Sequence, residues 1–255
     1  MTEASVAHSD GPSYDRFMGR WSRAAGDMFL AWLGPPKHVR WLDVGCGTGV
    51  FTDLVLQACD PLSIEGLDSQ PAQIQWARSQ HQSARINFRI GDAHDLPFAN
   101  DTYDVVSSAL VLNFLSHPLK ALNEMCRVAR PGAIVAAYIW DFVNERTPNS
   151  CLCAGLRHVG IEAPRFPRIE LVELFHQTAY RDINTQTFDV TVTFDSFETF
   201  WQSQTPDFSP ITKTIGALLP PEKTKLVEFV RKRSLGKDGV ASWSARAHAI
   251  RARVP

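Results

Sequence analysis

A short glycine-rich stretch, WLDVGCGTGVFTDLV at residues 41–55, has the residue types and spacing to hold a ligand. An apolar run ends at Asp43, then Gly45, Gly47 and Gly49 alternate with other residues, and a helical pattern follows. Glycine tolerates a positive φ angle and lets backbone N–H groups approach a ligand closely. The N-terminus of the helix that follows favours an anionic group. The stretch therefore predicts a ligand-binding turn between a strand and a helix, although an incidental turn after a buried strand could look the same.

A dinucleotide is one class of ligand that suits such a turn. A dinucleotide favours G-x-G-x-x-G, in which the third glycine lets the helix pack closely on the strand. Val50 occupies that third position here, so the dinucleotide fingerprint is incomplete. The stretch instead has the form D-x-G-x-G-x-G, with Asp43 two residues before the first glycine.

Two further acids follow predicted strands. Asp68 ends the apolar run of IEGLD, 25 residues after Asp43, and Pro71 then starts a helical pattern. A carboxylate at this place can accept hydrogen bonds from both hydroxyls of a ribose, or it can simply cap the helix. Asp92 ends the next predicted strand, in the segment GDAHDLPF.

These segments, taken in order, resemble class I S-adenosylmethionine (SAM)-dependent methyltransferases. The resemblance is to the methyltransferase type 11 group, which includes enzymes of ubiquinone and menaquinone biosynthesis. It covers residues 39–140 and includes EMCRVARPGAIVAAYIW at 124–140, where Ala133 replaces the second glycine that usually follows R-P-G. The resemblance implies SAM as the cofactor and S-adenosylhomocysteine (SAH) as the product.

It also implies roles for single residues. Amides of the glycine loop would meet the methionine carboxylate, and Asp43 would attract the ammonium through water or through the loop. Asp92 would hydrogen-bond the adenine amino group, while the Ala93 N–H would meet a ring nitrogen. The cofactor-binding residues expected are Tyr14, Arg20, Asp43, Gly45, Cys46, Gly47, Gly49, Asp68, Ser69, Gln73, Asp92, Ala93 and Ala109.

Tyr14 and Arg20 belong to YDRFMGRWSR, a segment that precedes the predicted sheet. Our hypothesis is that Tyr14, with Arg20 or Trp21, closes over the methionine end of SAM and that the arginine meets its carboxylate. The alternative is that Phe17, Trp21 and Met28 form a core stripe, which would leave the arginines in solvent.

The residues that bind the methyl acceptor are harder to predict from the sequence. Methyl transfer from a sulfonium needs correct orientation of the acceptor and requires no fixed catalytic motif. The candidates for a general base are His94, His117, His176 and Tyr138; we favour His117, which follows the fourth predicted strand. It could equally cap the next helix or lie on the surface. Asn113 and Phe114 in the same loop are predicted to contact substrate, as are Phe194 and Trp201 in a later aromatic stretch. Those later aromatics could instead pack in the core.

The elements that must position these residues follow an alternating pattern. Repeated strand–helix–strand units predict a parallel sheet with helices on both faces. Residues 183–194 and 241–250 read as strands that could add an antiparallel edge. The fold class expected is α/β: a doubly wound, Rossmann-like, three-layer α/β/α fold whose seven-stranded sheet is mostly parallel with an antiparallel edge. Predicted strands occupy 39–44, 62–67, 86–90, 103–109 and 133–140, and predicted helices 14–33, 48–58, 71–80, 117–129, 149–160, 168–179 and 221–235.

We expect a mobile N-terminus at 1–12 and a single methyltransferase domain at 13–255. Its expected parts are an N-terminal cap helix at 13–36, a SAM-binding core at 37–140, a helical lid at 141–182, and edge strands with inserted substrate-covering helices at 183–255.

The composition limits the classes of binding partner that we expect. Lys and Arg number 26 against 27 Asp and Glu, a net charge of −1 that gives no overall attraction to nucleic acid or an anionic membrane. The polar N-terminus lacks a signal-peptide pattern, and the apolar runs are too short to span a bilayer. Five loosely spaced cysteines favour reduced thiols, and no metal site is expected. The expectation is a cytoplasmic monomer or homodimer with a small-molecule methyl acceptor.

The leading interpretation is therefore a SAM-dependent methyltransferase that transfers a methyl group to an O, N or C nucleophile of a small apolar or aromatic molecule. The alternatives are a SAM-binding regulator without transferase activity and an NAD(P)-dependent oxidoreductase, which Val50 disfavours. A methyltransferase with a nucleic acid or protein target is a further alternative; the charge balance, and VLNF in place of a signature after the fourth strand, count against nucleobase methylation.

Overall fold

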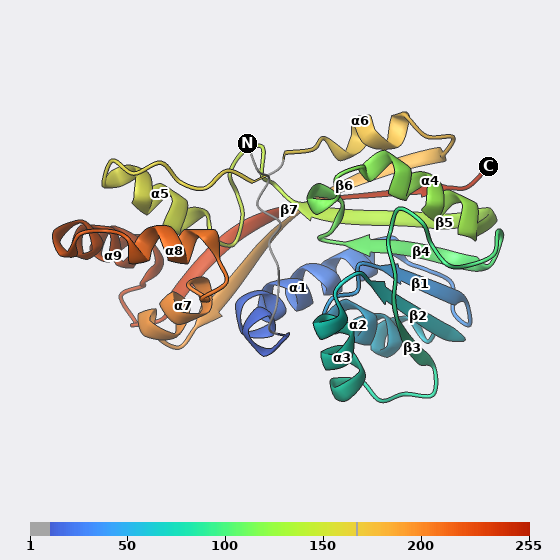
Figure 1. Cartoon of the computed structure of the whole chain (residues 1–255), viewed down its shortest axis with the longest axis horizontal. Helices are drawn as coiled ribbons and strands as arrows, with labels where there is room; N and C mark the ends of the chain where they lie inside the picture. The colour runs from blue at the N-terminus through green and yellow to red at the C-terminus, as the bar shows by residue number, and fades with distance from the viewer. Residues whose placement is uncertain (1–10, 167) are drawn as a thin grey trace.

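A seven-stranded sheet forms the centre of the computed structural model, which describes residues 11–166 and 168–255 (Figure 1). The strand order is β3-β2-β1-β4-β5-β7-β6, and β7 runs antiparallel to both of its neighbours while the other pairs are parallel. The mostly parallel sheet with an antiparallel edge is confirmed. The strands are β1 (Arg40–Val44), β2 (Ser63–Asp68), β3 (Ile86–Ile90), β4 (Tyr103–Ala109), β5 (Ala129–Trp140), β6 (Arg181–Phe194) and β7 (Ala241–Arg253).

Helices cover both faces of the sheet (Figure 1). On one face lie α1 (Gly11–Leu33), α2 (Val50–Cys59) and α3 (Pro71–Gln80), while α4 (Pro118–Val128) and α6 (Leu171–His176) lie on the other. The central strands are apolar on both sides because both sides are covered. Trp41 and Leu42, for example, point to opposite faces of β1 and are both fully buried.

Strands β6 and β7 continue beyond the end of β5 as a two-stranded ribbon, since Trp140 is the last β5 residue paired with β7. On one face of this ribbon Val190, Val192 and Phe194 are buried, and the residues between them are exposed, which is the period of two expected of a strand. A lobe of helices packs on the buried face (Figure 1). Its helices are α5 (Ser150–His158), α7 (Phe197–Gln204), α8 (Pro210–Gly216) and α9 (Pro220–Ser234).

Element boundaries differ from the sequence expectations mainly at their ends. Helix α2 begins at Val50 instead of 48, because Gly49 immediately before it has a left-handed backbone. Strand β5 begins at Ala129, four residues early, and continues through the R-P-G turn. The two helices expected as a lid over 141–182 lie apart: α5 packs on α9 in the lobe, and α6 packs on α4 and β7. The expectation for residues 1–12 falls mostly outside the described residues.

None of the helices in the described part of the chain has the length and apolarity that a membrane span requires.

Candidate active site

The carboxyl ends of β1 and β4 open into a cleft of about 810 Å³. Chain connections leave these two neighbouring strands in opposite directions, β1 toward β2 and β4 toward β5, and ligands of doubly wound sheets bind at such a point. The cleft walls come from α1, the glycine loop, the end of β2 and the segment after β4. The segment Pro164–Phe166 adds a wall that no sequence pattern indicated.

All three glycines of the loop have positive φ angles: 79° at Gly45, 53° at Gly47 and 84° at Gly49. A side chain at Gly45 would also collide with Val111, which comes from the segment after β4. Gly47 has open space on its Cβ side and lines the cleft. The loop therefore needs glycine for backbone conformation at all three positions and for close approach at Gly45 and Gly49.

Hydrogen bonds hold the loop against the end of β2. The Gly45 and Cys46 N–H groups donate to the Leu67 carbonyl oxygen at 2.7 and 3.0 Å, and Gly47 N–H donates to Asp68 Oδ2 at 2.9 Å. Burial, together with the negative charges of Asp43 and Asp68, raises the pKa of the Cys46 thiol, which keeps it protonated and unreactive.

Asp43 lies beneath the loop and is fully buried, so its side chain does not line the cleft. Its Oδ2 accepts a 2.7 Å hydrogen bond from the Thr52 hydroxyl, at the start of α2. Burial and the charge of Asp68 raise the pKa of Asp43 to about 7, against the lowering effect of hydrogen bonds from Thr52 and Ser107. Any attraction of Asp43 for a ligand cation therefore acts through the loop.

Asp68 ends β2 and lines the cleft. Its Oδ2 accepts from Gly47, and its Oδ1 accepts a 2.9 Å hydrogen bond from the N–H of Gln70, the N-cap residue of α3. Its carboxylate thus holds the residue that precedes α3 and faces the cleft, and its role toward a ribose stays a prediction.

Asp92 lies at the rim and is largely exposed. Its Oδ1 accepts hydrogen bonds from the backbone N–H of His94 at 2.8 Å and from His94 Nδ1 at 2.7 Å, and these bonds lower its pKa. His94 lines the cleft, whereas Asp92 and the buried Ala93 do not.

Helix α1 contributes Tyr14 to the cleft but turns Arg20 elsewhere. Arg20 donates to the Thr193 carbonyl oxygen at 3.2 Å and lies over the Phe194 ring. Trp21 is fully buried against Trp140, as the core-stripe alternative predicts, but Met28, which it also placed in the core, is exposed. Burial, and then the charge of Asp68, raises the pKa of Tyr14 to about 12, so its hydroxyl keeps its proton.

The structure brings most of the expected cofactor residues together. Five of the expected residues do not line the cleft: Arg20, Asp43, Gly49, Asp92 and Ala93. Gly49 faces away from it. Those that line it are Tyr14, Gly45, Cys46, Gly47, Asp68, Ser69, Gln73 and Ala109.

Some of the residues expected on the acceptor side line the cleft and others lie elsewhere. Asn113 and Phe114 line it. His117 is exposed just before α4, where its Nδ1 lies 2.9 Å from the Ser116 hydroxyl, and it does not line the cleft. Phe194 and Trp201 lie in the packing of α7 on β6, away from the cleft.

A small apolar cavity of about 70 Å³ adjoins the cleft, which we call the aromatic chamber. It shares Tyr14, Leu110, Phe114, Phe166 and Pro210 with the cleft wall. None of the described residues that line the chamber carries a charge. Its aromatic walls are Tyr14, Phe17, Phe114, Trp140, Phe142, Phe166 and Phe208.

Three phenylalanines stand at the junction of cleft and chamber. The Phe114 and Phe142 ring centroids are 6.1 Å apart and nearly perpendicular, and the Phe142 and Phe166 centroids are 5.7 Å apart. Sequence reasoning missed Phe142 and Phe166, because they follow different elements and share no motif with Phe114.

Comparison with known proteins identifies the chain. A family model described as a methyltransferase domain matches residues 42–137. O-methyltransferase rstn1 of Aspergillus nomiae is 35% identical over 157 residues, which are 59% of this chain and 68% of that protein. The chain belongs to the SAM-dependent methyltransferase family.

Other methyltransferases match less of their length. A malonyl-[acyl-carrier protein] O-methyltransferase of Pectobacterium atrosepticum is 33% identical over 123 residues, 48% of this chain and 47% of that enzyme. The chain thus spans about half the length of this curated relative. Phosphoethanolamine N-methyltransferase 2 of Haemonchus contortus, solved in complex with S-adenosyl-L-methionine, shares the fold, with a TM-score of 0.59 and 15% identity over 96% of this chain and 56% of that one.

The cleft of this methyltransferase has the chemistry that SAM requires. Its floor is a backbone loop with three left-handed glycines at a helix N-terminus, which suits a carboxylate. Asp68 presents a carboxylate at the end of β2, where a ribose can be held.

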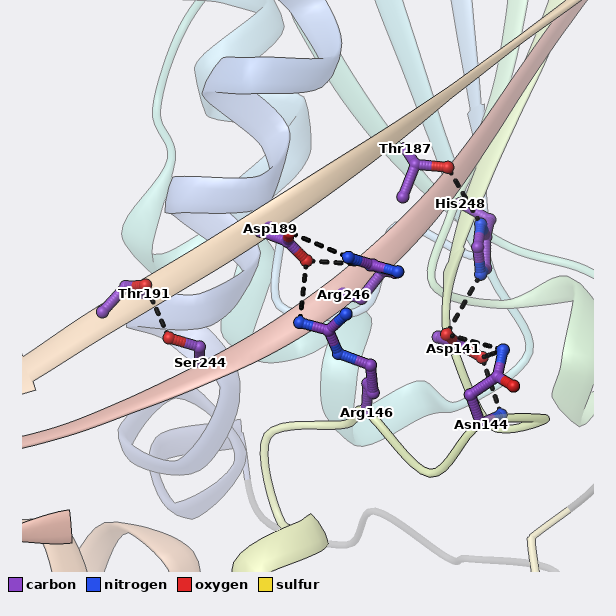
Figure 2. Close-up of polar contacts among 9 residues, drawn as sticks. All are labelled: Asp141, Asn144, Arg146, Thr187, Asp189, Thr191, Ser244, Arg246 and His248. Carbon is purple, nitrogen blue, oxygen red and sulfur yellow. Dashed lines mark hydrogen bonds and ion pairs between the residues drawn. The ribbon is translucent and has the colours of Figure 1, made fainter. Parts of the chain in front are cut away.

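A polar cluster on the exposed face of the ribbon anchors the segment that carries Phe142 (Figure 2). This segment, the β5–α5 loop at residues 141–149, begins at Asp141, which is buried. Asp141 Oδ1 accepts from the Asn144 N–H at 2.9 Å, and Oδ2 lies 3.3 Å from His248 Nε2 on β7. Burial alone would raise the pKa of Asp141, but the Asn144 hydrogen bonds and the charge of His248 lower it.

The same loop is tied to β6 and β7 through Asp189. This carboxylate accepts from Arg246 Nε and Nη2 at 2.8 and 2.9 Å, and it pairs with Arg146 of the loop at 3.2 Å (Figure 2). The exposed face of the methyltransferase ribbon therefore supports one wall of its aromatic chamber.

Proposed function

We propose that this chain transfers a methyl group from SAM to a small, neutral, apolar or aromatic acceptor that lies in the cleft against the walls of the aromatic chamber. The observation that carries this proposal is the chamber itself, which shares five lining residues with the cleft and has uncharged walls of mainly apolar and aromatic side chains. SAM, when bound, supplies an electrophilic methyl group on its sulfonium.

The protein's part is to orient the acceptor and exclude water. Correct orientation of two reactants accounts for several kcal/mol of a barrier, about 7 or more in favourable cases. The three phenylalanines at the junction hold an apolar acceptor by contact and leave little room for water. Such packing selects by shape and polarity instead of by charge.

The described walls of the chamber contain no carboxylate or imidazole, and the Tyr14 hydroxyl keeps its proton at neutral pH. The proposal therefore favours acceptors whose nucleophile needs little help to lose a proton, such as an acidic phenol or an electron-rich ring carbon. His117, the base favoured by the sequence, lines neither the cleft nor the chamber.

The test uses SAM with a labelled methyl group and a panel of neutral phenols and naphthols, beside carboxylated and amino analogues of matched size. Label is expected in the neutral acceptors. Phe142→Asp should abolish this transfer by placing a charge in the chamber, while Val143→Asp, at the exposed neighbouring position, should not.

Binding of SAH by both variants is the control for folding and for the cofactor site. Transfer to charged acceptors alone would contradict the neutral-acceptor proposal. Binding of SAH without transfer to any acceptor would favour a SAM-binding regulator.

A further inference from the structure

His81, which no motif indicated, lies directly behind the glycine loop. It is the residue that follows α3, and its backbone N–H closes that helix on the Ala77 carbonyl oxygen. Its side chain is only 15% exposed. Nε2 lies 3.1 Å from the Thr48 carbonyl oxygen, in the middle of the loop. Because a carbonyl oxygen can only accept, Nε2 must carry the proton of this hydrogen bond.

The other ring nitrogen faces the helix that the loop introduces. His81 Nδ1 lies 3.7 Å from Asp53 Oδ1, in the first turn of α2, and Asp53 also pairs with Arg23 at 3.8 Å. One imidazole thus contacts both the loop and the start of the helix whose N-terminus faces the cleft.

The ring of His81 also explains a glycine that does not line the cleft. A Cβ at Gly49 would come within 2.7 Å of His81 Cδ2 and 2.9 Å of Phe88 Cζ. The His81 and Phe88 rings pack together, with centroids 6.3 Å apart. The space beside Gly49 is therefore filled from outside the loop, and the left-handed conformation of Gly49 is enclosed by these two rings.

We propose that His81 is a positioning residue of the cofactor site: its Nε2–H bond to Thr48 holds the glycine loop in the conformation that binds SAM or SAH. The inference rests on the cofactor assignment in the proposed function. It adds a residue that does not line the cleft and acts through the backbone of Thr48, which does.

Two substitutions separate the hydrogen bond from the packing. His81→Phe keeps a ring against Gly49 and Phe88 but removes the donor, whereas His81→Gln keeps a side-chain N–H at similar reach. Loss of one such hydrogen bond is worth roughly 1 kcal/mol, so the dissociation constant for SAH should rise about fivefold in His81→Phe. It should stay within about twofold of wild type in His81→Gln. His176→Phe, on the exposed surface of α6, is the control for adding an aromatic ring.

A second readout needs no ligand. Amide hydrogen exchange at residues 45–52, measured without SAH, should be faster in His81→Phe and unchanged in His81→Gln and His176→Phe. Wild-type affinity together with wild-type exchange in His81→Phe would overturn the proposal. An equal or larger loss of affinity in His81→Gln, which keeps the donor and lacks the ring, would also overturn it. If the wild-type protein bound no SAH, the cofactor assignment would fail, and exchange would still decide whether His81 holds the loop.

Discussion

The charge state of one buried residue, Asp43, sets a pH dependence for the whole protein. Burial raises its pKa to about 7, from an ordinary value of 3.8. A raised pKa means that the folded state binds the proton more tightly than the unfolded state. The stabilising contribution is therefore complete below about pH 4 and is lost as the pH rises through about 7.

We predict that Asp43→Asn removes this dependence. Without cofactor, the free energy of unfolding of the wild type should fall by about 2–3 kcal/mol more than that of Asp43→Asn between pH 5 and pH 8. Urea unfolding at the two pH values measures this difference. If the free energy of unfolding fell equally in the two proteins between pH 5 and pH 8, Asp43 would be ionised in the folded protein throughout this range.

For single residues, the sequence predicted backbone conformation better than side-chain direction. The glycines at 45 and 47 follow from turn chemistry, and both were expected at the site. Arg20 was expected there too, but helix α1 directs it toward β6, where a backbone carbonyl oxygen accepts its hydrogen bond. Which way an arginine points depends on the packing of its helix, and the local sequence does not encode that packing.

Among the elements, the β5–α5 loop shows how an exposed polar cluster can serve a buried apolar cavity. The loop turns back on β7, where Asp141 N–H donates to the Arg246 carbonyl oxygen at 2.8 Å and Arg246 N–H donates to the Arg146 carbonyl oxygen at 2.7 Å. Glu145 within it has a φ angle of 55°, which is unfavourable for a residue with a side chain. The surrounding bonds must therefore hold the loop in place.

We predict that Asp189→Asn loosens this loop, because it removes the carboxylate that pairs with Arg146 and Arg246. Amide hydrogen exchange at residues 141–149 should be a few-fold faster. Solvent screens these half-exposed pairs, so a larger change is not expected. Asp195→Asn, an exposed acid just after the same strand, is the matched control, and identical exchange in the two variants would contradict the prediction.

For the whole molecule, the cofactor should act as a stabiliser. A ligand that binds only the folded state, at 100 times its dissociation constant, adds about 2.7 kcal/mol to the free energy of unfolding. For a chain of 255 residues this corresponds to a rise in Tm of roughly 5–10 °C.

We predict such a rise with SAH and none with NADH at the same concentration, measured by scanning calorimetry. A rise with NADH alone would contradict the assignment of the cleft and revive the oxidoreductase alternative. The physical ground for the prediction is Val50, which replaces the glycine that a dinucleotide site uses for close helix packing.

The sequence by itself determined the cofactor of this protein and the strand ends that form most of its cleft. Its binding elements are contiguous, each a strand end followed by a turn, and glycine and aspartate have strong local preferences at such places. The parallel order and the antiparallel edge also follow from local patterns, because strand–helix–strand units have few ways to pack.

Only the tertiary structure decided the acceptor half. The aromatic chamber takes its walls from α1, the segments after β4 and β5, the region around Phe166 and the approach to α8. Phenylalanines at these places look alike whether they line a cavity or fill a core, as Phe142 and Phe194 do respectively. Apolar burial has no direction, so distant parts of the chain determine which ring meets a ligand.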